Sequence, residues 1–284
     1  MKIALPNKGR LYEPCMQLFE RAGLRPIDAG MRRLFAKTLD PEIDILFARA
    51  QDIPEYVQDG AADLGVTGYD LIMEAKANVE ILLDLEFGVA ELVLAAPNSS
   101  KIKDAGDLRG KRVATQFPNL TTQFFKEKGI DVKIVEVSGA TEITPHVGIA
   151  EAIIDLTSSG TTLAVNQLQI IERVLLTSAR LIVNKESLKK NKAKIGEIQT
   201  ALESVIQAEG KRYIMMNVPK AVLEKVKKVM PGLAGPTVMQ VESGASTVAV
   251  HAVVNEGDVF AIINALKGAG AKDILVVPIE RMVR

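Results

Sequence analysis

Several residue types are scarce in this chain, and each scarcity narrows what the protein can be. Of its 284 residues one is cysteine, two are histidine and none is tryptophan. A single cysteine, Cys15, excludes an internal disulfide framework. His146 and His251 lie far apart in the sequence, and with one cysteine they do not make up a typical zinc site. Each histidine is therefore expected to be an ordinary solvated or core residue.

Long apolar runs and an excess of one charge are also missing. No apolar run approaches the ~20 residues of a membrane span, and the first residues, MKIALPNKGRL, are interrupted by Pro6, Asn7 and Lys8, unlike a signal peptide. The 35 basic side chains balance the 35 acidic ones. We therefore expect a cytoplasmic protein with no nucleic-acid or membrane partner. With 48% apolar residues, it has enough chain for two or three globular domains.

The most informative stretch of the chain is residues 142–163, EITPHVGIAEAIIDLTSSGTTL. It predicts a helix, a short apolar segment that carries Asp155, a tight polar turn and a second helix. Glycine lets the backbone approach an anion, hydroxyls donate to it, and amides at a helix start carry partial positive charge, so this turn suits a phosphate. The turn consists of Thr157, Ser158, Ser159, Gly160, Thr161 and Thr162.

Asp155, just upstream of the turn, is poorly placed for phosphate but suits sugar hydroxyls, because a carboxylate only accepts hydrogen bonds. A phosphorylated ribose would use both parts. The alternative is that these Ser, Thr and Gly residues only cap a helix. That alternative is favoured for any three of them, whereas the full run favours a phosphate site.

Three predicted strands near the beginning of the chain each end in polar residues. Strand 2–6 precedes Lys8, Gly9 and Arg10, strand 43–48 precedes Arg49, and strand 64–67 precedes Asp70. Helices are expected at 11–22, 53–58 and 69–77. Open α/β sheets bind ligands at the carboxyl ends of their strands. For Lys8, Gly9 and Arg10, an ordinary solvent-exposed loop between strand and helix is an equally good explanation. The recurrence of polar residues at three strand ends favours a functional interpretation.

The middle of the chain indicates a second α/β unit inserted into the first. Strands are expected at 79–85, 91–96, 112–115, 133–137, 170–178 and 180–184, with a helix at 119–128, and the chain changes character at Gly88. This order predicts two lobes with a cleft between them, lobe I comprising residues 1–88 and 180–209 and lobe II residues 89–179. Residues 187–208 are expected to form one long amphipathic helix.

The last part, residues 210–284, has the strand and helix order βαββαβ of a ferredoxin-like unit. Its strands are expected at 212–218, 237–241, 247–254 and 273–279, and its helices at 219–229 and 258–267. The segment KGAGAK follows a helix and is interpreted as a helix C-cap rather than a nucleotide turn. Few titratable residues lie at the element ends, which favours regulation or assembly over chemistry.

These segments together resemble one enzyme family over the whole chain, the long form of ATP phosphoribosyltransferase, which begins histidine biosynthesis. ALPNKGRL at 4–11, RAQDIP at 49–54, DLGVTGYDL at 63–71 and KRYIMMNVP at 211–219 are similar to family segments. The most specific part is the signature for phosphoribosyl pyrophosphate (PRPP), matched by Glu142, Gly148, Ala150, Ile153, Asp155, Leu156, Ser159, Gly160, Thr162 and Leu163.

The resemblance implies an α/β fold with a bilobal catalytic core like the type II periplasmic binding proteins, and a C-terminal ferredoxin-like (ACT-like) regulatory domain. It implies transfer of the phosphoribosyl group of PRPP to N1 of ATP, giving N1-(5-phospho-β-D-ribosyl)-ATP and pyrophosphate, with Mg2+ on the phosphates and no metal ligand assigned to a side chain. Histidine is the implied feedback inhibitor, AMP a further candidate ligand, and dimers and hexamers the implied assemblies.

The same resemblance implies roles for individual residues. Asp155 and Glu142 would bind PRPP with the turn 157–162, Asp155 holding the ribose hydroxyls and the turn the 5′-phosphate. Lys8, Gly9, Arg10, Arg49 and Asp70 would lie on the opposite lobe around ATP and pyrophosphate. Thr237 would lie near the histidine pocket.

Displacement of pyrophosphate from an anomeric carbon builds negative charge on the leaving group, which arginines and a metal ion stabilise. Arg10, Arg49 and Arg33 are the predicted catalytic residues, and no residue is a dedicated base. The main alternative is a non-catalytic bilobal sensor or binding protein for a small ligand. An ordinary ATPase or kinase is disfavoured because the sequence has no GxxxxGK[ST] loop.

Overall fold

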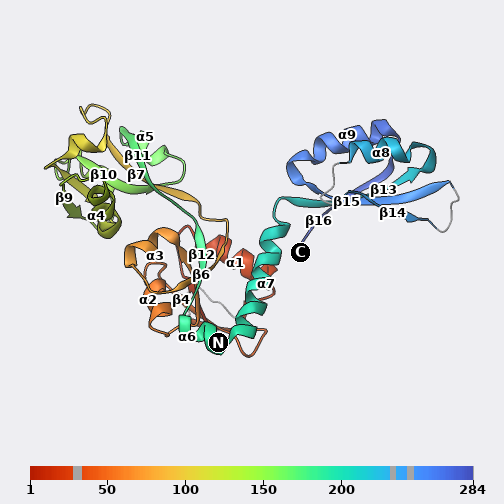
Figure 1. Ribbon diagram of the computed structural model, residues 1–284, viewed down its shortest axis with the longest axis horizontal. Coiled ribbons are helices and arrows are strands. Elements are labelled where there is room, and N and C mark those ends of the chain that lie inside the picture. The colour runs from red at the N-terminus through yellow and green to blue at the C-terminus, as the bar shows by residue number, and fades with distance from the viewer. Residues whose placement is uncertain (28–33, 231–234, 242–245, 284) are drawn as a thin grey trace. The chain divides into compact units, whose positions relative to one another are not determined.

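The computed structural model describes residues 1–27, 34–230, 235–241 and 246–283. Arg33, a predicted catalytic residue, lies outside the described residues. The chain divides into two compact units, Met1–Gln199 and Thr200–Arg284. The first unit contains two sheets and the second unit one (Figure 1).

The first sheet of the described residues has seven strands in the order β2-β3-β4-β1-β5-β12-β6. They are β1 Lys2–Pro6, β2 Pro26–Ile27, β3 Phe35–Thr38, β4 Asp44–Ala48, β5 Leu64–Gly68, β6 Glu80–Asp84 and β12 Ala179–Val183. Helices α1 (Tyr12–Arg21), α2 (Ile53–Gln58) and α3 (Tyr69–Ala75) connect them. β1 is parallel to both β4 and β5, and its apolar residues Ile3 and Leu5 are fully buried. The parallel centre is buried on both faces, which explains why these strands are continuous apolar runs.

The second sheet of the described residues has five strands in the order β11-β7-β10-β8-β9. They are β7 Ala90–Pro97, β8 Arg112–Thr115, β9 Lys133–Glu136, β10 Ala152–Thr157 and β11 Leu168–Thr177, with helices α4 (Pro118–Glu127) and α5 (Thr161–Val165). β10 is central: it runs parallel to β8 and antiparallel to β7. The apolar side of α4, with Phe124 and Phe125, packs on Val113 and Ile154 of this sheet.

The chain passes between these two sheets twice, from β6 to β7 and from β11 to β12. In the first sheet, Gly68 at the end of β5 pairs with Ala179, and Asp84 pairs with Arg180. In the second sheet, Thr157 at the end of β10 pairs with Glu91, while Thr177 pairs with Ala90. Both crossovers therefore adjoin the carboxyl edges of the parallel strands of both sheets.

The second unit contains a four-stranded antiparallel sheet with the order β14-β15-β13-β16. Its strands are β13 Lys211–Pro219, β14 Thr237–Gln240, β15 Thr247–Asn255 and β16 Lys272–Pro278, and its helices are α8 Leu223–Val229 and α9 Val259–Ala269. Both helices lie on one face of the sheet (Figure 1). This is the ferredoxin-like arrangement, so the predicted α/β class with a βαββαβ unit at the end is confirmed. Gly270 caps α9 in the left-handed conformation, with φ 100°, as KGAGAK predicted.

Two predicted helices are wrong. Residues 142–150 do not form a regular helix: a short 3-10 helix covers Thr141–Ile143, and Asp155 lies on the central strand β10. Pro145, which lacks a backbone N–H, and Gly148, which has the left-handed φ of 72°, interrupt a helix there. The expected helix 187–208 is two helices, α6 (Lys185–Lys190) and α7 (Lys192–Ala208), which break at Asn191. The short strands β2 and β3 were not predicted.

Among the helices of the described residues, none combines the length and the apolar character needed to cross a membrane.

Candidate functional site

Five of the predicted residues lie together at the carboxyl edge of the first sheet. β1, β4 and β5 are parallel neighbours, so the residues that follow them emerge at one edge. The Asn7 amide donates to the Ala48 carbonyl at 2.8 Å, which holds the end of β1 beside the end of β4. Lys8, Gly9, Arg10 and Arg49 are exposed there, whereas Asp70 is buried. The edge thus carries three exposed cationic side chains and one buried carboxylate.

Arg10 is turned back toward the first crossover. Gly9 has φ 83°, a left-handed conformation that glycine adopts without strain, and its carbonyl accepts from the Tyr12 amide at 3.1 Å. The Arg10 guanidinium donates to the carbonyl of Gly88 and lies 3.5 Å from Asp70 Oδ1. The side chain remains 38% exposed. Its free donors can therefore reach a bound anion.

Asp70 is held from the other crossover by Thr177, a residue that the sequence reasoning missed. The Thr177 hydroxyl donates to Asp70 Oδ1 at 2.6 Å and accepts from the Asp70 amide at 3.0 Å. The two residues are 107 positions apart, so no local pattern could have revealed the pair.

A second cluster at the same crossing was also missed. Ser178 donates to Asp84 Oδ1 at 2.8 Å, Arg180 pairs with Asp84, and the Arg180 guanidinium lies 5.3 Å from the centre of the Tyr69 ring. Burial opposes ionisation of Asp84, but its hydrogen bonds and the charge of Arg180 outweigh that effect, so the Asp84 pKa is lowered. This cluster ties the beginning of β12 to β6 and α3.

The second group of predicted residues lies at the carboxyl edge of β10. Asp155 is partly buried on this strand, and its Oδ1 accepts from the Leu156 amide at 2.7 Å. Burial raises the pKa of the Asp155 carboxyl above its ordinary value. The Leu156 amide and the Thr141 hydroxyl oppose the shift, while the negative charge of Glu142 adds to it. Asp155 is thus a poorly solvated carboxylate with spare acceptor capacity.

The polar turn follows Asp155 directly. Gly160, at φ 73°, leads into α5, and its amide donates to Thr157 Oγ1 at 2.9 Å. The hydroxyls of Ser159 and Thr161 lie 2.9 Å apart, and Ser158, Ser159, Thr161 and Thr162 are exposed. Buried Leu163 anchors α5 to the core. The turn therefore displays hydroxyls on a short element with a fixed base.

The segment before β10 is fastened to α5 at its far end. Nε2 of His146, which is exposed, lies 2.6 Å from the Asn166 carbonyl. Thr141 is fully buried, and its carbonyl accepts from the Thr144 hydroxyl at 2.7 Å. Glu142, next to Thr141, is close enough to Asp155 for its negative charge to help raise the pKa of that carboxyl. Thr141 is another residue that the sequence reasoning did not single out.

Metal binding by protein groups alone finds no support in the described ranges, where no group of three or more His, Cys, Asp or Glu side chains could hold an ion. Asp155 and Glu142 are the two carboxylates among the predicted PRPP-binding residues. Mg2+ is commonly bound by one or two carboxylates together with substrate phosphates. This donor set fits that mode of binding.

The remaining predicted residue, Thr237, lies on β14 in the second unit. It is exposed and pairs in register with His251 of β15. Nδ1 of His251 lies 2.5 Å from the Tyr213 hydroxyl. Thr237 is therefore next to a polar pair on the sheet, within the ferredoxin-like unit itself.

Comparison with known proteins gives one family over nearly the whole chain. The family model described as ATP phosphoribosyltransferase matches residues 49–204, and the model described as HisG, C-terminal domain, matches residues 208–281. An ATP phosphoribosyltransferase of Methanocella arvoryzae is 61% identical over 284 residues, 100% of both chains. One of Methanococcoides burtonii is 59% identical, covering 100% of this chain and 99% of that one.

Solved structures agree with this. An ATP phosphoribosyl transferase (HisG:HisZ) complex from Thermotoga maritima contains a chain with a TM-score of 0.65 and 28% identity, aligned over 73% of this chain and 98% of that one. A substrate-binding protein of an amino acid ABC transporter aligns with a TM-score of 0.50 at 14% identity, over 73% of this chain and 93% of that one. The second likeness concerns the fold alone and agrees with the predicted scaffold of a periplasmic binding protein.

Proposed function

The chain belongs to the ATP phosphoribosyltransferase family, and from this premise we propose that it transfers the phosphoribosyl group of PRPP to N1 of the adenine of ATP. The products are N1-(5-phospho-β-D-ribosyl)-ATP and pyrophosphate, in the first step of histidine biosynthesis. The observation that carries this proposal is a partly buried carboxylate, Asp155 on β10, with the hydroxyl turn 157–162 at the carboxyl end of the same strand.

In this proposal β10 and its turn bind PRPP. Asp155 and Glu142 accept hydrogen bonds from the ribose hydroxyls, because carboxylates are acceptors only. The exposed hydroxyls of the turn donate to the 5′-phosphate, and Gly160 keeps the backbone free of a side chain at the point of approach. No heavy atom lies within 4 Å of the position where a Cβ would stand on Gly160, so this side of the turn is open.

The cationic edge of the first sheet binds the leaving group and ATP. As the bond between the anomeric carbon and the pyrophosphate oxygen breaks, negative charge grows on the pyrophosphate. Arg49 and Arg10, both exposed at that edge, stabilise this charge, with Lys8 as a further cation, and Arg33 keeps its predicted catalytic role. Gly9 and Asp70 shape the ATP and pyrophosphate side of the site, where Asp70 orients Arg10.

When bound, Mg2+ would neutralise charge on the phosphate groups, and Asp155 and Glu142 are the carboxylates of this site that could help to hold it. The chain supplies no dedicated base in this scheme. The nucleophile is a ring nitrogen with a free lone pair, so attack requires alignment rather than deprotonation. Holding two anionic substrates at adjoining sheet edges then provides much of the rate enhancement.

The ferredoxin-like unit has a regulatory role in this proposal. Histidine binds near Thr237 and inhibits the enzyme, and the chain associates into dimers and hexamers, the inhibited state favouring the hexamer. AMP is a further ligand of the nucleotide side. Buried Cys15, the only cysteine, suits a reducing compartment, and the reaction takes place in the cytoplasm.

Ultraviolet absorbance tests the reaction directly, because alkylation at N1 changes the adenine chromophore. Incubation with ATP, PRPP and Mg2+ should give a new absorbance band that is absent when PRPP is omitted. Formation of ADP instead would indicate an ATPase. A chain that binds PRPP but consumes neither substrate would be the bilobal binding protein considered as the alternative, a class that shares the scaffold but not the family membership.

A further inference from the structure

Thr177 makes a two-way contact with a buried carboxylate at the point where β11 crosses to β12. Its hydroxyl donates to Asp70 Oδ1 at 2.6 Å and accepts from the Asp70 amide at 3.0 Å. Thr177 and Asp70 are each 1% exposed. Water therefore does not compete for either bond.

Both bonds depend on the same hydroxyl group. Because the Asp70 amide can only donate, the oxygen of Thr177 must accept there, and its own proton is left for the carboxylate. Valine, which has nearly the same shape, can make neither bond. Gly68 contributes as well, because a Cβ on it would collide with Asp70 Oδ1. The Asp70 carboxylate is thus seated in one position.

The same carboxylate oxygen faces Arg10. Its guanidinium lies 3.5 Å from Asp70 Oδ1 and donates to the carbonyl of Gly88 on the other crossover. One polar chain, Thr177 to Asp70 to Arg10 to Gly88, therefore connects both crossovers to the carboxyl edge of the first sheet. Among the groups of this polar chain, only the Arg10 side chain is exposed.

We propose that Thr177 is a positioning residue for the transfer reaction: it seats Asp70, and Asp70 in turn directs the Arg10 guanidinium toward the departing pyrophosphate. This inference rests on the proposed function, which assigns the leaving group to Arg10. The thermodynamic reason is preorganisation, because a guanidinium that is already oriented loses no rotational freedom when charge develops on the pyrophosphate.

The test uses the full chain and compares Thr177→Val with Thr177→Ser. Thr177→Val should lower kcat about tenfold, since a hydrogen bond to a charged group is lost, while KM for ATP and for PRPP changes less than about threefold. Thr177→Ser keeps the hydroxyl and should recover most of the rate. Thr38→Val is the matched control: Thr38 is also buried and donates to main-chain carbonyls, but near Ile43, at the opposite edge of the sheet. Its kcat should match wild type.

A double-mutant cycle with Arg10→Lys separates positioning from a structural role. If Thr177 acts through Arg10, Thr177→Val should cost little further rate in the Arg10→Lys background. Wild-type kcat for Thr177→Val, or an equal loss in both backgrounds, would overturn the inference. If Thr177→Val does not fold, Asp70→Asn takes its place under the same two criteria. Unchanged kinetics for Arg10→Lys and for Arg10→Ala would instead refute the role of Arg10 in the proposed function.

Discussion

Replacing Asp155 by asparagine should change ligand binding and stability in opposite directions. The substitution keeps the shape of the side chain and one acceptor oxygen, but removes the charge. In the proposed site the carboxylate accepts from ribose hydroxyls, and hydrogen bonds to charged groups contribute about 1.5–3 kcal/mol each. Losing the charge from two such bonds should cost about 2–4 kcal/mol, or roughly 30- to 1,000-fold in the Kd for PRPP.

The same substitution, Asp155→Asn, should make the folded protein more stable at pH 7. Burial raises the Asp155 pKa in the folded protein, whereas in the unfolded chain it is about 3.9. A group whose folded pKa is raised favours the folded state below the unfolded value, and that contribution is lost as the pH rises through the folded pKa. At pH 7 the ionised carboxylate therefore opposes folding. Asp155→Asn should have a higher Tm than wild type at pH 7, and the difference should shrink as the pH falls toward 4.

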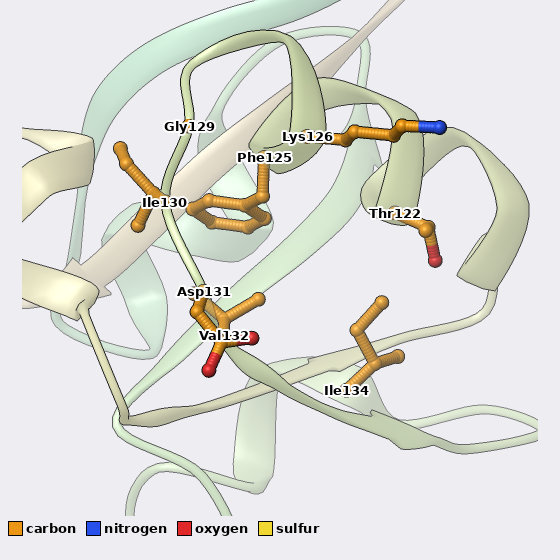
Figure 2. Close-up of a pocket in the computed structure, with 8 residues that line it drawn as sticks. All are labelled: Thr122, Phe125, Lys126, Gly129, Ile130, Asp131, Val132 and Ile134. Atoms are coloured by element: carbon orange, nitrogen blue, oxygen red, sulfur yellow. The ribbon is translucent and has the colours of Figure 1, made fainter.

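Calorimetric titration with PRPP and thermal unfolding between pH 4 and 8 measure both effects on the same samples. Asp131→Asn is a suitable control, because Asp131 is an exposed carboxylate of the same lobe that lines a shallow pocket of about 400 Å3 between α4 and β9 (Figure 2). It should leave both measurements unchanged. A PRPP affinity within threefold of wild type would refute the assignment of Asp155 to the ribose. A lower Tm at pH 7 would refute the claim that burial of its charge is costly.

Three further predictions concern other parts of the site. Arg49→Ala should lower kcat at least 100-fold, as loss of a transition-state donor does, while its Tm stays near that of wild type because Arg49 is exposed. Arg25→Ala replaces another exposed arginine and is the control. A wild-type kcat for Arg49→Ala would show that Arg49 is not part of the site. Gly160→Ala and Gly110→Ala should each cost about 1 kcal/mol of stability by strain, because both glycines have φ 73° and open space around them. Only Gly160→Ala should also weaken PRPP binding, and equal PRPP affinity in the two variants would contradict a phosphate site at the turn. Thr237→Val should raise the histidine concentration needed for half-inhibition in steady-state assays, and an unchanged value would place the effector site elsewhere.

Local patterns identified most elements, because their causes are local. β1 and β4 are apolar runs followed at once by a polar residue, β5 ends at Gly68, and α2 was predicted with its observed bounds, Ile53–Gln58. The ferredoxin-like unit followed from the order of its elements alone. The polar turn 157–162 was also recognisable from its composition, and its binding of a phosphate stays a prediction.

Patterns failed where distant chain segments decide the conformation. The short apolar segment that carries Asp155 was predicted only as a connection between two helices, whereas it is the strand β10, which pairs with β7 on one side and with β8 on the other. The short strands β2 and β3 exist because β4 offers an edge to pair with. In both cases the strand depends on pairing with another segment of the chain, which the amino acids of the strand alone do not reveal.

The sequence by itself determined which chemical groups are available and which strand each one follows: a hydroxyl turn after the strand that carries Asp155, cations after two other strands, and Asp70 after a third. Only the tertiary structure decided which of them meet. Asp70 and Thr177 are 107 residues apart and make contact because the chain passes from β11 into β12, which pairs with β5 in the first sheet. The burial that raises the pKa of Asp155 is likewise a property of the folded sheet, because a carboxyl loses its water only when other segments pack around it.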